Sequence, residues 1–190
     1  MIQTHHRNRE CIMRTSFVFL LIAILNSTCS VAQTTKNQPR WDGYNFMLGT
    51  WQGVGTGTPG EASGGFTFER DLQGTVLVRK NYAVYPSTAD RPGFRHDDLM
   101  VVYHASAADT RAMYFDNEGH VIAYQVRVDP SRSAVFLSDS STSAPRFRMT
   151  YAAIGADSLG MLFEIAPPGK PDGFVPYITA RAYRVKGTGN

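Results

Sequence analysis

From residue 49 onward, apolar and polar residues alternate with a period of two, in short segments separated by turn-forming residues. This period places successive side chains on opposite faces of a β-strand. Regularly spaced segments of this kind, bounded by Gly, Pro, Asn, Asp and Ser, are typical of an all-β barrel or sandwich. The pattern predicts ten strands, near residues 49–57, 63–71, 75–85, 96–105, 110–116, 120–128, 133–139, 145–153, 158–166 and 174–186.

The first predicted strand has glycine at alternate positions around one tryptophan. Gly49, Trp51, Gly53 and Gly55 would share one face, with an indole at one end and bare backbone beyond it. Glycine weakens a strand interior, so its repetition indicates a bend or a close approach by another backbone or a ligand. We therefore expect Trp51, Gly53 and Gly55 to have structural roles. The Pro59-Gly60 pair should end the strand in a turn.

This stretch resembles the opening strand of calycin barrels. Gly49-x-Trp51 is similar to the lipocalin signature, and its extension through further alternate glycines resembles nitrobindin-type barrels. The resemblance in strand rhythm covers roughly residues 44–186. It implies a single antiparallel up-and-down barrel with an internal cavity. A last-strand arginine covers the tryptophan in lipocalins, which implies Arg181 or Arg184 in that position here.

Residues 1–32 have the features of a signal peptide. An apolar run over 16–25 follows Arg14, and the small residues of Ser30-Val31-Ala32 suit cleavage before Gln33. The run is too short to span a bilayer. We expect an exported protein, periplasmic or secreted, whose mature chain has no membrane span.

Several details of this leader stay open. Met13 is an alternative start to Met1, and Cys29 lies in an Asn26-Ser27-Thr28 context that is poor for a lipoprotein. Residues 33–43 are expected to be a polar lead-in, with one helical turn within 41–48 closing the barrel, and 187–190 a tail.

Composition narrows the possible partners. Both cysteines, Cys11 and Cys29, belong to the leader, so the mature domain must be stable without a disulfide. Most of the formal net charge of +3 comes from the leader arginines, and we expect no nucleic-acid partner. The sequence leaves the oligomeric state open.

Up-and-down connectivity sorts the predicted loops by barrel end. The connections after odd-numbered strands are mostly longer and richer in Pro, Gly and Ser than the others. Long loops on a rigid scaffold commonly carry binding residues. We call their end the mouth and the opposite end the floor. The longer set is 58–62, 86–95, 117–119, 140–144 and 167–173.

Candidate catalytic residues gather at the mouth. His96 and His120 each begin a strand there, and Asp116 ends the strand between them. Glu164 would join them if its side chain pointed inward. Imidazoles and carboxylates together could perform acid–base catalysis. The alternative is a solvated rim, since Asp116 also begins an ordinary hairpin turn. The spacing matches no metal-binding motif, and His104, at the floor, is expected to be structural.

A second group could line the cavity. Arg79 and Asn81 share one face of their strand. They would be polar anchors in an apolar pocket if that face is inward, and solvated if it is outward. The full set of ligand-binding candidates is Arg79, Asn81, Tyr114, His120, Tyr124, Glu164 and Tyr177.

These observations favour a barrel that binds a small, largely apolar ligand. The alternatives are a small enzyme using the mouth residues and a ligand-free structural barrel filled by its own side chains. Nitrobindin-type barrels hold haem through a histidine on a late strand, but the last histidine here is His120. We therefore expect no cofactor, haem included. Tyr177 or Tyr183 could substitute for that histidine in principle.

Overall fold

The computed structural model describes residues 41–57 and 62–186, which belong to the larger of two compact units of the chain, Thr35–Asn190. The predicted signal peptide, Cys29 and the Pro59-Gly60 turn lie outside the described residues. In the described part of the chain, no helix is long and apolar enough to cross a membrane.

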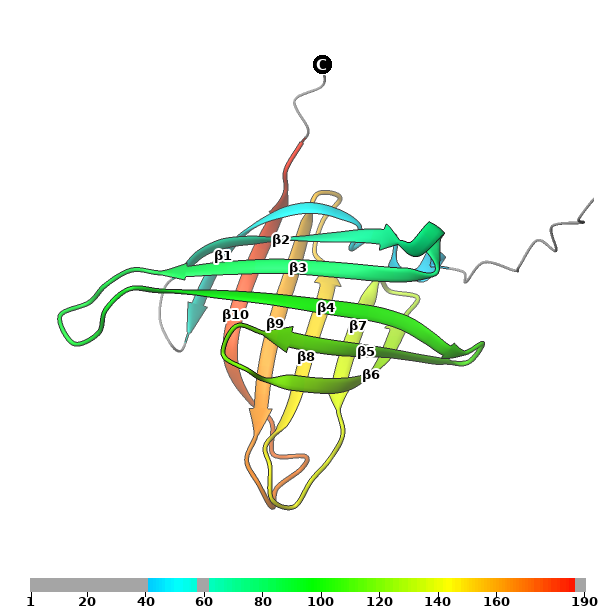
Figure 1. Cartoon of the computed structure of the whole chain (residues 1–190). Coiled ribbons are helices and arrows are strands. Elements are labelled where there is room, and N and C mark those ends of the chain that lie inside the picture. The colour runs from blue at the N-terminus through cyan, green and yellow to red at the C-terminus, as the bar shows by residue number, and fades with distance from the viewer. Residues whose placement is uncertain (1–40, 58–61, 187–190) are drawn as a thin grey trace, which may run out of the picture. The chain divides into compact units, whose positions relative to one another are not determined.

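Ten strands form a closed antiparallel barrel in which each strand pairs with its neighbours in sequence and β1 pairs with β10 (Figure 1). The predicted up-and-down barrel is confirmed. The strands are β1 (Gly49–Gly57), β2 (Ala62–Asp71), β3 (Val76–Tyr85), β4 (Phe94–Ser106), β5 (Asp109–Asp116), β6 (Val121–Asp129), β7 (Ser133–Ser138), β8 (Arg146–Ala153), β9 (Ser158–Ala166) and β10 (Val175–Arg184).

Two short 3-10 helices, η1 (Asp42–Tyr44) and η2 (Leu72–Gly74), complete the described elements. η1 lies in the segment expected to close the floor, and both Trp41 and Tyr44 are buried there. The Trp41 indole donates to the carbonyl of Gly74 at 2.8 Å. The floor is therefore sealed by packed side chains that are anchored to the backbone.

Trp51 lies at the centre of this floor with 1% of its surface exposed. Its indole N–H donates to the Met47 carbonyl at 2.7 Å, which ties β1 to the segment before it. The Arg184 guanidinium lies 4.2 Å from the centre of the indole and donates to the Leu48 carbonyl. Arg184, rather than the exposed Arg181, thus covers the tryptophan.

The close backbone approach expected at the glycines of β1 occurs instead on β2. A Cβ at Gly53 would make only ordinary contact with the carbonyl of its register partner Gly64. A Cβ at Gly64 would collide with the Tyr82 carbonyl of β3, and one at Gly65 would lie 2.6 Å from the Trp51 carbonyl. What a Cβ at Gly55 would contact lies outside the described part of the structure.

Candidate functional site

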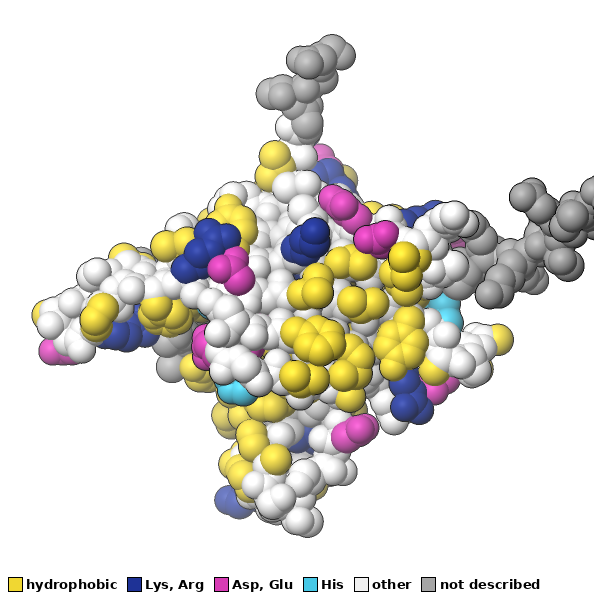
Figure 2. All heavy atoms as spheres, in the orientation of Figure 1, with side chains coloured by type: hydrophobic (Ala, Val, Ile, Leu, Met, Phe, Trp, Pro, Cys, Tyr) yellow, Lys and Arg dark blue, Asp and Glu magenta, His cyan; other side chains and the backbone are white. Residues whose placement is uncertain are grey.

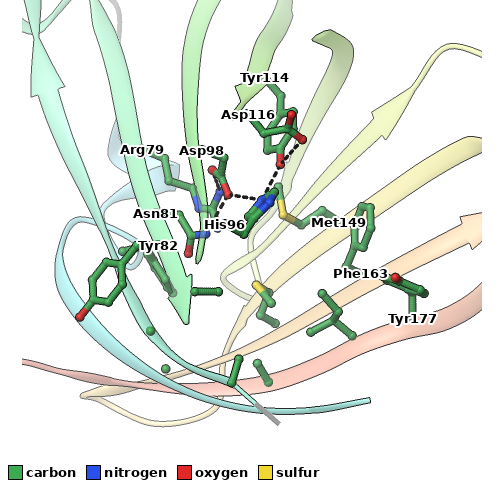
Figure 3. A pocket seen from close by; sticks show the side chains of 18 of the residues that line it. Arg79, Asn81, Tyr82, His96, Asp98, Tyr114, Asp116, Met149, Phe163 and Tyr177 are labelled. Carbon is green, nitrogen blue, oxygen red and sulfur yellow. Dashed lines mark hydrogen bonds and ion pairs between the residues drawn. The ribbon is translucent and has the colours of Figure 1, made fainter. Parts of the chain in front are cut away.

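A cavity of about 550 Å³ opens inside the mouth half of the barrel, above the packed floor. This volume lies within the range of small-molecule sites. Figure 3 shows polar side chains from β3, β4 and β5 gathered on one side, facing apolar side chains from later strands. The apolar wall includes Ile122, Phe147, Met149, Met161, Phe163, Ile165, Ile178 and Ala180.

Alternation along β3 turns Leu77, Arg79, Asn81 and Ala83 inward, which resolves the orientation that the sequence left open. Arg79 is 3% exposed although it carries a charge. Burying a guanidinium is costly unless an anion pairs with it. Its position therefore requires a partner within the barrel.

Asp98 of β4 is that partner. It forms an ion pair with Arg79 Nη1, and its other oxygen accepts from Asn81 Nδ2 at 2.8 Å. The Arg79 guanidinium also lies over the rings of Phe66 and Tyr151, at 5.5 and 5.9 Å. Burial is the largest single influence and would lower the pKa of Arg79, but Asp98 and the nearby tyrosines together outweigh it and the net shift is upward. Among the described residues, Arg79 Nε and the Tyr151 hydroxyl are buried polar atoms with no hydrogen-bond partner.

His96 continues this network toward the mouth. Its Nε2 lies 3.4 Å from Asp98 Oδ2 and 3.1 Å from the Tyr114 hydroxyl, and its Nδ1 lies 2.8 Å from Glu118 Oε1. The hydrogen bond to Asp98 raises the pKa of His96 to about 9; burial opposes the shift, and Glu118 adds to it. Both ring nitrogens are therefore protonated donors at neutral pH.

Tyr114 links His96 to the rim. Its hydroxyl donates to Asp116 Oδ2 at 3.3 Å, and the same carboxylate oxygen accepts from His120 Nδ1 at 2.8 Å. Burial raises the pKa of Tyr114, so this phenol stays protonated. Burial would also raise the pKa of Asp116, but hydrogen bonds from His120 and Glu118 outweigh it and lower the value. A continuous polar network thus runs from buried Arg79 to the rim.

The structure brings the predicted mouth residues His96, Asp116 and His120 into this one network. Asp98, which connects it to Arg79, is the member that sequence reasoning missed. The sequence did contain a signal for Asp98. It lies two residues after His96, and its side chain therefore shares the same face of β4. Its pairing with Arg79 depended on the register between β3 and β4.

The remaining candidates divide between cavity and exterior. Tyr124 and Tyr177 line the cavity, and Tyr124 is 3% exposed. Glu164 does not line it. Met161 and Phe163 face inward, so Glu164 lies on the outer face of β9. There it accepts two hydrogen bonds from Arg148, at 2.6 and 2.7 Å. This placement corrects the expectation that Glu164 could join the mouth residues.

His104 lies at the floor, away from the network. Its ring stacks on Trp41 with centroids 4.2 Å apart, and its Nδ1 lies 2.9 Å from the Thr110 hydroxyl. These contacts give it a packing role. Within residues 41–57 and 62–186, no group of three His, Cys, Asp or Glu side chains is arranged to hold a metal ion.

Comparisons with known proteins give no family for this chain. No family model matches it. No curated protein matches it either. Similar solved structures include a designed fluorescence-activating β-barrel, with 14% identity over 76% of this chain and 98% of that one, at a TM-score of 0.39. The S-type phycobiliprotein lyase CpeS from Guillardia theta has 9% identity over 76% and 92%, at 0.48.

A DUF3598-family protein of unknown function from Nostoc punctiforme is 9% identical over 76% of this chain and 98% of that one, with a TM-score of 0.29. At these TM-scores the likenesses carry no argument about ligand or activity. The barrel fold rests on the strand order and register of the chain itself.

Proposed function

We propose that this barrel binds a small, largely apolar molecule that ends in an uncharged polar group. The observation that carries the proposal is the cavity of about 550 Å³, with one apolar wall and one hydrogen-bonded polar wall. Mostly apolar pockets with a few convergent polar groups are the usual form of small-molecule sites. An unfilled volume of this size also argues against the alternative of a barrel packed solid by its own side chains.

The polar wall supports a neutral rather than anionic ligand group. Its cations are already matched by carboxylates: Arg79 with Asp98, and His96 with Asp98 and Glu118. A ligand carboxylate placed here would be repelled by these carboxylates, and the polar wall has no spare cation to offset that repulsion. A hydroxyl, amide or carbonyl could instead exchange hydrogen bonds with Tyr114 or His96. Arg181 also borders the cavity but has an exposed side chain.

The direct test is native mass spectrometry of the purified protein, followed by extraction and identification of any bound molecule. A matched pair of probes, a long-chain alcohol and the carboxylate of equal chain length, then tests the ligand class. The alcohol should bind more tightly, by about tenfold or more. Equal or tighter binding of the carboxylate, lost in Arg181→Ala, would contradict a neutral polar end.

Two neighbouring substitutions on β10 test whether the cavity is the site. Ala180 faces the cavity, while Thr179 beside it is exposed on the outer face. Ala180→Trp should fill the cavity and abolish binding of the alcohol probe, whereas Thr179→Trp should leave it unchanged. Equal binding by both variants would show that the probe binds elsewhere.

An acid–base enzyme is the second candidate, favoured by the network that joins His96, Tyr114 and Asp116. A protonated imidazole bonded to a phenol could donate a proton to a bound substrate. Once the bound molecule is identified, its conversion can be followed with His96→Gln and Tyr114→Phe. Binding without turnover in the unaltered protein favours the carrier; turnover lost in both folded variants favours the enzyme.

We also propose that the barrel acts outside the cytoplasm and without haem. The support is the leader-like sequence of residues 1–32 and the lack of histidine in β7–β10. N-terminal sequencing of the exported protein should begin at Gln33. Added hemin should give no saturable Soret shift that survives gel filtration. Such a shift would contradict the proposal that the barrel acts without haem.

A further inference from the structure

The outer surface of β3, β4, β5 and β6 carries a continuous group of apolar side chains, seen as the large yellow area of Figure 2. The strand register places them in rows that cross the strands. Val78, Val101, Met113 and Ala123 are successive cross-strand partners and form the middle row. The whole group, called here the apolar face, is Val76, Val78, Leu99, Val101, Tyr103, Met113, Phe115, Val121 and Ala123.

The side chains of this face are exposed or half-buried in the barrel as described. Val121 is 61% exposed, Phe115 40% and Leu99 37%, and these three belong to one row. The outer surface of β1 and the start of β2 is more mixed, because the polar residues Thr50, Gln52 and Ser63 share it with Val54. The barrel therefore has a specific apolar side. In an antiparallel sheet that faces water, the outward residues at these alternate positions would instead be polar.

The size of the apolar face suits the centre of a protein interface. The nine positions, on strands about 4.8 Å apart and in rows about 6.6 Å apart, cover roughly 290 Å². The largest apolar patch on a soluble monomer is of roughly this size, and it is often functional. A standard interface buries about 800 Å² on each partner, with an apolar centre and a polar rim. The surrounding polar residues would supply the remaining area.

The rim carries both signs of charge. Glu69 and Asp71 of β2 border one side, and Lys80 of β3 borders another. Arg111 of β5, which pairs with Asp109, and Arg127 of β6 lie toward the remaining edge. A surface with acidic and basic edges is complementary to an identical surface turned by a two-fold rotation, whereas a rim of one sign would repel it.

We propose that the apolar face is the interface of a homodimer, in which the sheets of two barrels pack face to face about a two-fold axis. Sheet faces pack about 10 Å apart with interleaved side chains, which this regular array of branched and aromatic residues permits. The proposal is independent of the ligand. The polar network lies on the inner face of these strands, so this dimer would leave each cavity unobstructed by its partner.

Sedimentation velocity of the purified protein, from low to several hundred micromolar, tests the proposal. The unaltered protein should sediment as a dimer that dissociates on dilution. Val101→Lys, at the centre of the apolar face, should raise the dimer dissociation constant by roughly tenfold or more. The matched control is Val54→Lys on the outer surface of β1, which is 62% exposed and outside the face. It should leave the constant unchanged.

A measurement independent of the variants' stability is cross-linking through Val101→Cys, made in a chain with Cys11→Ser and Cys29→Ser. Efficient disulfide dimers through position 101, and few through Val54→Cys, support the proposal. If the unaltered protein stays monomeric at all concentrations, the dimer proposal is overturned. Binding of the monomer to lipid vesicles or to another protein through this face also overturns it, and assigns the face to that partner.

Discussion

His96 has an acceptor on each ring nitrogen, and this fixes its charge. Asp98 and Tyr114 contact Nε2, and Glu118 contacts Nδ1. We expect His96 to titrate near pH 9 in an NMR titration, well above its ordinary value of 6.5. Glu118→Gln should lower that pKa partly and Asp98→Asn more, because Asp98 contributes the larger share. A His96 pKa near 6.5 in the unaltered protein would contradict the network.

The same shift predicts a pH dependence of stability. The pKa of His96 is higher in the folded protein than in the unfolded chain, so its imidazolium stabilises the fold fully below about pH 6.5. That contribution is lost as the pH rises through about 9. Urea denaturation should show a decline in unfolding free energy across this window, and the decline should be smaller in His96→Gln. Equal declines would assign the effect to other groups.

Trp51 is the residue on which closure of the floor depends. Trp51→Ala removes a fully buried indole together with its hydrogen bond to Met47, and should cost about 3–5 kcal/mol of unfolding free energy. Chemical denaturation measures this directly. Arg181→Ala, at an exposed site on the adjacent strand, should change it by less than about 0.5 kcal/mol. A cost below about 1 kcal/mol for Trp51→Ala would mean that the floor repacks around the gap.

At the scale of elements, Gly53 and Gly64 are register partners on adjacent strands with different surroundings. Gly64→Ala would drive a methyl group into the Tyr82 backbone and should destabilise the barrel by about 1–3 kcal/mol. Gly53→Ala should be tolerated, since its Cβ would make ordinary contacts. Thermal melts of the two variants give the comparison. Equal destabilisation would show that β1 needs glycine for its own bending.

Strand positions could be predicted from the sequence because period-two alternation and turn residues are local signals. Side-chain direction was harder. The strand around Glu164 is apolar at both Leu162 and Phe163, so alternation alone could not say which face was inward. The ion pair of Arg79 with Asp98 was out of reach for another reason: it depends on the register across a long connection, and that register comes from packing of the whole barrel.

At the scale of the whole molecule, the described barrel contains no cysteine, because the two in the chain are Cys11 and Cys29. Its stability must come from packing and strand pairing. We expect a chain that begins at Gln33 to have the same melting temperature with and without reducing agent. Calorimetry in both conditions is the check, and the full-length chain is the comparison. A shift in the chain that begins at Gln33 would contradict the expectation, because that chain contains no cysteine.

Pairing of β1 with β10 joins segments from opposite ends of the domain, with Trp51 beside Arg184. A growing chain that still lacks β10 would leave β1 and β9 with unpaired edges, and such edges recruit other strands. Closure also brings together residues far apart in sequence, which slows folding. The barrel can therefore close only after β10 has been synthesised. Until β10 has been made, the nascent chain would expose these two edges to other strands.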